Sequence, residues 1–249
     1  MAHRKKTYRH RGGDILEVME YHDGRYGAPG QPRQKRRKAT AEEIRRVNQY
    51  NKRMRCWRKL INYFGEGDFY MTLTFRKEER PKDMAEAKGI WRKFLRELRK
   101  AYKKAEMPFR WIRNIEVGSR NGWHIHVVLK RIPDLDAIVA KLWKFGRAVS
   151  ERIYLQGDMR DLAAYMTKTP ETDRRQRETD YDASRNMPIP EPKKTVLRGK
   201  NADLTKKIRV PKGYVLDEAS VVRGVNPWGF MYRHYLLRRV IDITQRRTT

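Results

Sequence analysis

The sequence predicts an α+β fold, a central antiparallel β-sheet with helices packed on one of its faces. Residues 69–75 alternate large apolar side chains with Tyr and Thr, which is typical of a strand with one buried face. Two β-branched runs, 109–117 and 122–130, flank the turn residues of 118–122 and predict a hairpin. Helical periodicities precede, separate and follow these strands. The order α-β-α-ββ-α-β-α over 40–170 favours an antiparallel sheet.

The predicted helices have recognisable ends. Thr40 and Glu43 have the spacing of a capping box, and apolar residues then recur at helical intervals as far as Phe64. A second helix is expected to begin after Asp83, and a third after Asp134. A weak strand over 152–155 and a short helix over 158–169 follow, the latter ending before Pro170, which disfavours helical geometry in the residue before it.

Three segments are expected. Residues 1–39 are rich in Arg, Lys, Gly and Pro with little apolar periodicity, which predicts a basic, largely flexible arm. Residues 40–170 hold the predicted sheet and helices, and form the expected central domain. Residues 171–249 begin as a polar, proline-bearing stretch and regain strand-like runs, so we expect a basic C-terminal extension packed on that domain.

Charge identifies the kind of partner. The 249 residues include 59 Lys and Arg against 30 Asp and Glu, a formal net charge of +29. Each of the three segments carries a positive surplus, which indicates a polyanion whose phosphates neutralise the charge. Nucleic-acid-binding proteins and nucleases both have this composition, so charge alone does not separate them.

Several classes of protein are disfavoured by the sequence. There is no apolar run of about 18 residues, as a membrane-spanning helix needs. The charged N-terminus is unlike a secretory signal, and the single cysteine, Cys56, excludes disulfides and a multi-cysteine zinc site. No Walker-type loop is present, so no nucleotide cofactor is expected. We expect a cytoplasmic protein without a membrane partner.

The hairpin carries the first candidate site. His124 and His126 lie two apart on a predicted strand, so their imidazoles share a face. If the hairpin loop has an odd number of residues, Glu116 and Asn114 lie opposite them, and two imidazoles and a carboxylate would suit a divalent cation. A two-residue Asn121-Gly122 turn would instead put Glu116 on the other face. A hydrogen-bonded histidine pair and an exposed carboxylate are the structural alternatives.

A tyrosine and a lysine form the second candidate site. On the 158–169 helix, Tyr165 and Lys168 share a face apart from the buried stripe. A solvated amphipathic tyrosine is the simpler interpretation of Tyr165 alone. Tyr154 and Tyr181 compete with it as nucleophiles; Tyr181 is flanked by two Asp residues, and Tyr154 has no cation comparable to Lys168 on its face.

Taken together, these elements resemble the three ordered motifs of rolling-circle replication initiators, the His-hydrophobe-His (HUH) single-strand endonucleases of plasmids and phages. The motifs are the strand 71–75, then Glu116 ahead of 124–126, then Tyr-Met-Thr-Lys at 165–168. The resemblance covers about residues 40–170 and makes that segment the expected HUH endonuclease domain, with an RRM-like or ferredoxin-like core.

Two further stretches, 64–68 and 184–188, look like the plasmid and phage branch. The chain departs from viral and some plasmid relatives because it has no helicase domain. It departs from two-tyrosine phage initiators because its helix has one candidate tyrosine.

The resemblance implies a chemistry. Mg²⁺ or Mn²⁺ would be held by Glu116, His124 and His126, and Tyr165 would attack the scissile phosphate to leave a 5′-phosphotyrosyl DNA and a 3′-hydroxyl. Lys168 would neutralise or orient a phosphate beside the nucleophile. The residues expected to contact DNA are Thr72, Thr74, Asn114 and Arg120.

The implied function is nicking and joining of single-stranded or hairpin origin DNA to initiate rolling-circle replication, with a host helicase as a partner. A single-tyrosine transposase or relaxase shares the same motifs. A non-catalytic single-strand-binding protein is the alternative from another class, since aromatic residues interleaved with Lys and Arg serve base stacking equally well.

Overall fold

The chain forms two compact units. In the computed structural model, the described residues are 3–22, 38–154, 159–225 and 230–240. One unit comprises Thr40–Ile189, and the other combines Met1–Ala39 with Pro190–Thr249. Each unit contains one five-stranded sheet in which every pairing is antiparallel. The predicted α+β class with an antiparallel sheet is confirmed.

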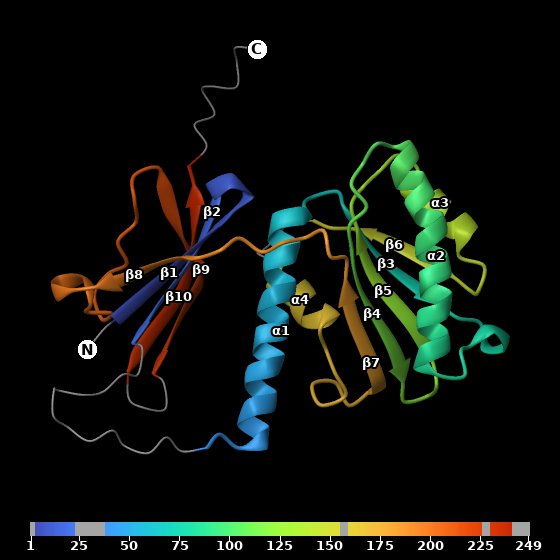
Figure 1. Ribbon diagram of the computed structural model, residues 1–249, viewed down its shortest axis with the longest axis horizontal. Coiled ribbons are helices and arrows are strands. Elements are labelled where there is room, and N and C mark those ends of the chain that lie inside the picture. The colour runs from blue at the N-terminus through green and yellow to red at the C-terminus, as the bar shows by residue number, and fades with distance from the viewer. Residues whose placement is uncertain (1–2, 23–37, 155–158, 226–229, 241–249) are drawn as a thin grey trace, which may run out of the picture. The chain divides into compact units, whose positions relative to one another are not determined.

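The Thr40–Ile189 unit is built on a sheet of strand order β6-β3-β5-β4-β7, with four helices around it (Figure 1). Its strands are β3 Phe69–Thr74, β4 Trp111–Gly118, β5 Trp123–Leu129, β6 Ala148–Arg152 and β7 Gln176–Ala183. Its helices are α1 Ala41–Tyr63, α2 Met84–Lys104, α3 Leu135–Leu142 and α4 Arg160–Met166, with a 3₁₀ turn at Lys77–Glu79.

The main core lies between one face of this sheet and helices α2 and α3. Alternate residues of β3 and β5, such as Met71, Leu73 and Ile125, point into it and meet Trp91 and Leu98 of α2. Because strand side chains alternate between faces, residues 70, 72 and 74 of β3 lie on the opposite face. The helical and strand periodicities in the sequence therefore converge on one buried layer.

Helices cover both faces of the sheet, which corrects the expectation of helices on one face. Helix α4 packs against α1, and Tyr165 of α4 reaches His126 on the face opposite α2. In Figure 1, α1 and α4 lie on one side of this sheet and α2 on the other. The reason is that the short α4 buries Ala163 and Met166 completely and needs a second apolar partner, which α1 supplies.

The predicted helix starts are observed at two sites. Thr40 and Glu43 form the reciprocal capping box of α1, and the Asp83 side chain accepts a hydrogen bond from the Glu86 amide at the start of α2. Asp134 precedes α3 without a side-chain cap, in a left-handed conformation. Within the described residues, no helix combines the length and apolarity that crossing a membrane requires.

The second unit corrects the predicted domain organisation. Its sheet has the order β8-β1-β2-β10-β9, formed by β1 His3–His10, β2 Ile15–His22, β8 Lys193–Leu197, β9 Tyr214–Val225 and β10 Met231–Arg239. Short 3₁₀ turns lie at Arg11–Gly13 and Gly199–Asn201. Residues 3–22 are thus paired strands and not a flexible arm, while residues 23–37 of the expected arm lie outside the described residues.

The expected boundary at 170 also moves. Residues 171–189 stay with the central unit, because β7 pairs with β4, whereas residues 190–249 join the N-terminal strands. The pairing of β2 with β10 joins residues more than 200 positions apart, which sequence periodicity does not reveal.

Two glycines of the central unit should respond oppositely to alanine. A Cβ at Gly146 would lie 2.1 Å from the Thr74 carbonyl oxygen, whereas a Cβ at Gly89, inside α2, meets nothing within 4 Å. We expect Gly146→Ala to lower the free energy of unfolding by roughly 1–3 kcal/mol through overpacking. Gly89→Ala should raise it by up to about 1 kcal/mol through helix propensity. Urea denaturation of both variants checks this, and equal effects would contradict it.

Candidate functional site

The β4–β5 hairpin brings the predicted carboxylate and histidines to one face. Glu116 pairs with His124 and Asn114 with His126, and the last pair before the turn is Val117 with Trp123. The connection between that last pair is residues 118–122, an odd number, so the odd-loop prediction is confirmed. Directly opposed residues share a face, and Glu116 therefore lies with the histidines.

Strand β3 extends the same rows on the other side of β5. Thr74 pairs with His124 and Thr72 with His126. Tyr70, two residues before Thr72, shares their face by alternation. The hydroxyl-bearing face of β3 thus lies beside the histidine face of β5.

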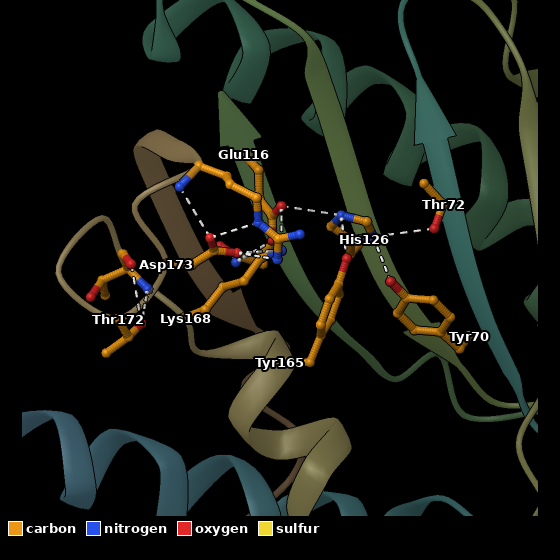
Figure 2. A network of polar contacts seen from close by, with 11 residues as sticks. Tyr70, Thr72, Glu116, His126, Tyr165, Lys168, Thr172 and Asp173 are labelled. Carbon is orange, nitrogen blue, oxygen red and sulfur yellow. Dashed lines mark hydrogen bonds and ion pairs between the residues drawn. The ribbon is translucent and has the colours of Figure 1, made fainter. Parts of the chain in front are cut away.

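His126 is at the centre of the site. Its Nε2 lies 3.3 Å from Glu116 Oε2 and 3.2 Å from the Tyr165 hydroxyl. Its Nδ1 lies 2.5 Å from the Tyr70 hydroxyl and 3.2 Å from that of Thr72. Figure 2 shows the ring held between Glu116 and Tyr165 on one side and Tyr70 and Thr72 on the other. Both ring nitrogens have partners, which fixes the orientation of the imidazole.

Tyr70 was not among the residues predicted from the sequence. Burial raises the pKa of its phenol, so Tyr70 stays neutral and can exchange a hydrogen bond with Nδ1. The alternation of β3 had already placed its hydroxyl on the face of Thr72. That alternation was the available signal, and the contact with His126 depends on the β3–β5 register.

Glu116 is a buried carboxylate with three partners. Its side chain is 2% exposed; besides His126, it accepts a hydrogen bond from Asn114 Nδ2 at 3.0 Å and pairs with Lys168 Nζ at 2.9 Å. Burial by itself would raise the pKa of Glu116, but His126 and Lys168 together bring that pKa below its ordinary value. Glu116 therefore stays ionised at neutral pH.

Helix α4 supplies the candidate nucleophile and its cation. Tyr165 is 40% exposed, while Lys168, just beyond the helix, is buried with its Nζ 4.0 Å from the centre of the Tyr165 ring. The backbone of this segment is held by the Gln49 side chain, which donates to the Thr167 carbonyl at 2.7 Å. Lys168 thus connects the tyrosine ring to the buried carboxylate of Glu116.

Asp173 is a second residue that the sequence did not indicate. Its carboxylate accepts two hydrogen bonds from the Arg175 guanidinium and lies 3.9 Å from Lys168 Nζ. The Arg175 hydrogen bonds lower the pKa of Asp173 to about 2. The turn through Thr169 and Thr172 brings it back to Lys168, and only the folded turn creates this contact.

The donor set has the chemistry of a divalent-cation site. Carboxylate oxygen and imidazole nitrogen suit Mg²⁺ or Mn²⁺, and the buried Oδ1 of Asn114 has no hydrogen-bond partner among the described residues. His124 has a lowered pKa, first through burial and then through His126, and is neutral at pH 7. The types of ligand atom present are therefore those that a divalent cation prefers.

The spacing brings two of the three predicted ligands together. Glu116 and His126 are in contact, while the centre of the His124 ring lies 6.2 Å from that of His126. A Cβ at Gly122 would lie 3.2 Å from His124 Nε2, so the ring leans toward the hairpin turn. Across the described ranges, no group of three acidic, histidine or cysteine side chains is gathered closely enough to hold a metal ion.

The expected DNA-contacting residues differ in exposure. Arg120 is exposed in the hairpin turn, and Thr72 is half-buried against His126. The Thr74 hydroxyl is engaged with the backbone of Arg147. Asn114 is fully buried beneath Glu116, which corrects its assignment as a DNA contact and makes it a support for the carboxylate.

The competing tyrosines are away from His126. β6 ends at Arg152, so Tyr154 is not on the predicted strand, and its side chain is 73% exposed. Tyr181 lies on β7 opposite Asn114, where burial and the neighbouring Cys56 raise its pKa and disfavour the phenolate. Of these three hydroxyls, that of Tyr165 lies within hydrogen-bonding distance of His126 Nε2.

The Lys168–Glu116 pair should matter more than a surface pair. Lys168→Met leaves a buried carboxylate short of a cation, so we expect it to lower the free energy of unfolding by about 3 kcal/mol. The matched control is Lys100→Met, which breaks a 2.7 Å pair with Glu97 whose lysine side chain is 71% exposed. That change should cost less than about 0.5 kcal/mol.

Adding Glu116→Gln to Lys168→Met should recover part of the loss, because it removes the unpaired charge. A strictly additive pair of losses would contradict the coupling. The pKa of Glu116 is lower in the folded protein than in the unfolded chain. Its contribution to the free energy of unfolding is therefore present at pH values above the unfolded-state pKa and is lost as the pH falls through the folded-state pKa. Chemical denaturation across that acidic range should therefore show that the free energy of unfolding falls less steeply with decreasing pH in the Glu116→Gln variant than in the wild type.

Residues 68–170 match the family model described as replication-associated protein ORF2/gene-2 protein. No curated protein and no solved structure matches the chain. The matched segment runs from the residue before β3 to the second residue after Lys168, and so contains Tyr70, Glu116, both histidines and Tyr165. The part of the chain that carries the site is therefore similar to replication-associated proteins.

Proposed function

We propose that the protein is a replication initiator that nicks and rejoins single-stranded DNA through a covalent 5′-phosphotyrosine, and so starts rolling-circle replication. The observation that carries the proposal is the convergence on His126 Nε2, which lies 3.2 Å from the Tyr165 hydroxyl and 3.3 Å from the buried carboxylate of Glu116. The hydroxyl of the candidate nucleophile and the carboxylate of one candidate ligand thus both lie close to the Nε2 atom of a second candidate ligand. The similarity to replication-associated proteins supports the same role.

Glu116, His126 and His124 would hold the divalent cation, Mg²⁺ or Mn²⁺. When bound, that cation supplies positive charge that polarises the scissile phosphate and stabilises the charge that develops on it. His126 offers Nε2 when its proton is on Nδ1, where the Tyr70 and Thr72 oxygens accept it. Asn114 holds the Glu116 carboxylate in place.

Tyr165 is the proposed nucleophile. Its oxygen forms a bond to phosphorus while the bond from phosphorus to the 3′ oxygen breaks, and the proton of the phenol passes to solvent, which reaches this half-exposed side chain. The departing 3′ oxygen takes up a proton. Attack by a 3′-hydroxyl on the phosphotyrosine reverses the step and joins strands without an external energy source.

Lys168 is proposed to assist both partners. Its ammonium lies 4.0 Å from the centre of the Tyr165 ring and 2.9 Å from Glu116, so it supplies positive charge beside the reacting phenol. Asp173 lies close to the same ammonium. Arg120, exposed at the hairpin turn, would contact the DNA backbone, and a partner helicase would supply the unwinding.

Tyr165→Phe should abolish covalent capture of DNA. Labelled single-stranded oligonucleotides are incubated with Mn²⁺ and the full chain, and covalent complexes are separated on denaturing gels. Non-covalent affinity should stay within a few-fold, because one hydroxyl contributes little beside many phosphate contacts. Tyr154→Phe, which alters a 73% exposed tyrosine, is the matched control and should form the adduct like the wild type.

An undiminished adduct in the Tyr165→Phe protein would overturn the assignment of the nucleophile. Complete absence of an adduct from the wild type, together with normal binding, would favour a non-catalytic single-strand-binding protein.

The two histidines should differ in their dependence on metal. His126→Ala should reduce nicking at low Mn²⁺ on the order of 100-fold, since a bound cation contributes several kcal/mol to transition-state stabilisation. High Mn²⁺ should restore part of it through Glu116 and His124. His124→Ala should reduce nicking less, because Glu116 and Tyr165 have their hydrogen bonds and ion pairs with His126 and Lys168 and not with His124. Removal of metal by EDTA should stop nicking and leave binding intact; nicking that persists in EDTA would contradict the site.

A further inference from the structure

The sheet of the Met1–Ala39 and Pro190–Thr249 unit has a basic, aromatic face that the proposed chemistry does not use. These two segments hold 25 Lys and Arg against 9 Asp and Glu. The charge excess is thus at least as dense here as in the unit that carries Tyr165. A polyanion that binds this sheet would have to lie on one of its two faces.

One face of this sheet is taken up by the unit's own core. Leu16, Val18, Tyr235 and Leu237 are buried there and pack against Ile208. The 204–208 segment crosses the same face, where the Arg233 guanidinium on β10 donates to the carbonyls of Leu204 and Lys206. On the opposite face Glu17, Leu236 and His234 are buried as well, whereas Lys194 and Tyr232 are exposed, so the part of this face around the exposed residues is the one open to a ligand.

The strand register defines two adjacent rows on that opposite face. In the first, Arg4 pairs with Tyr21, Tyr21 with Tyr232 and Tyr232 with Gly224, and Val196 completes the row on β8. Because opposed residues share a face, Tyr21 and Tyr232 are cross-strand neighbours on β2 and β10.

The second row lies beside the first and continues the positive charge. It consists of Lys194, Lys6, Met19, His234 and Val222 across the five strands. Neither of the two rows contains an acidic residue. The next row on this face contains Glu17 of β2 and Asp217 of β9. The Nε2 atoms of His10 and His234 lie within 3.1 Å of Glu17, and Asp217 pairs with Arg238 at 2.8 Å. The carboxylates nearest to these two rows thus have partners within the unit.

The rings lie where bases can reach them. Tyr232 is 38% exposed, and a Cβ at Gly224 would lie 2.6 Å from its ring, so the glycine lets that ring lie close against the strand. Lys6 Nζ lies 5.2 Å from the centre of the half-buried Tyr21 ring, and Lys194 is exposed. Two tyrosine rings on one face, with lysines beside them, form a surface that combines π-faces with phosphate-binding charge.

We propose that this face binds single-stranded DNA, with unpaired bases stacked on Tyr21 and Tyr232 and the backbone neutralised by Lys6 and Lys194. Stacking on a flat sheet requires unpaired bases, because the faces of bases in a duplex are covered by their neighbours. The inference rests on the proposed function for the identity of the nucleic acid. It assigns to this unit the holding of the strand, separate from the chemistry at Tyr165.

The stacking is tested with the full chain and a fluorescent oligo(dT), by anisotropy in EDTA so that no cleavage occurs. Tyr232→Ala and Tyr21→Ala should each weaken binding on the order of tenfold, the loss of one base–ring stack. The matched Tyr→Phe variants keep the ring and should bind like the wild type. Affinity for a duplex of equal length should change little in all four. Alanine variants that bind oligo(dT) as tightly as the wild type would overturn the proposal.

The contribution of charge to binding is tested by salt titration. This test uses other variants, so it remains valid if a tyrosine-to-alanine variant fails to fold. Lys6→Gln and Lys194→Gln should each lower the slope of log affinity against log salt by about 0.7. Lys207→Gln is the matched control, because Lys207 is exposed on the segment that crosses the opposite face. Equal slopes for all three lysine variants would contradict the assigned face.

Covalent capture separates this inference from the proposed function. With Mn²⁺ and saturating oligonucleotide, Tyr232→Ala should reach the wild-type amount of adduct and need a higher DNA concentration to do so. If the wild type gives no adduct while the anisotropy differences persist, the proposed chemistry fails and the binding face stands. Normal adduct together with unchanged affinity in Tyr232→Ala would reject the binding face alone.

Discussion

The register of the β4–β5 hairpin is the constraint on which the candidate site depends. Because side chains alternate along a strand, a slip of one residue would move Glu116 to the face that packs on α2 and α3. The turn sets this register: Asn121 has a positive φ of 57°, and the amide of Gly118 donates to the carbonyl of Gly122. That geometry gives the odd connection that puts Glu116 opposite His124. The neighbouring strands then extend the same rows.

The buried charge of Glu116 connects the residues of the candidate site that lie on the strands with those at the end of α4. Ionised Glu116 at 2% exposure needs polar partners, and Lys168 supplies a cation from just beyond α4 while His126 supplies a ring nitrogen from β5. Asp173 lies close to Lys168 from the other side. The same contacts that stabilise the carboxylate therefore bring Tyr165 to His126. In the proposed function, electrostatic stability and nucleophile placement have a single origin.

The two units divide the chain in a way that suits the two proposals. The Thr40–Ile189 unit buries its functional polar groups in a network around His126, whereas the other unit presents rings and lysines on a sheet face. The first arrangement suits chemistry at one phosphate, and the second suits contact with several nucleotides. Both use antiparallel sheets, since directly opposed side chains on such sheets gather on one face.

The sequence by itself determined the local elements and indicated most residues of the candidate site. Alternation at 69–75, the capping residue Thr40 and the histidines two apart are short-range patterns, and the helices and strands they predict are observed. The resemblance supplied the pairing of Tyr165 with the histidines, which local pattern alone left open. The contact between Tyr70 and His126 was predictable only in part. Alternation along β3 gives the face on which Tyr70 lies, whereas only the β3–β5 pairing identifies His126 as its partner.

Only the tertiary structure decided the rest. Residues 3–22 read as a basic arm because β1 carries few apolar side chains; it is ordered by pairing with β2 and with β8, the latter nearly 200 residues away. The same applies to β7, whose polar sequence gains its place as an edge strand from β4, and to Asp173, which reaches Lys168 through a turn. Asn114 looked like a DNA contact until burial beneath Glu116 gave it another role. Contacts between distant segments depend on backbone hydrogen bonds and buried charge, and neither leaves a periodic signal in the sequence.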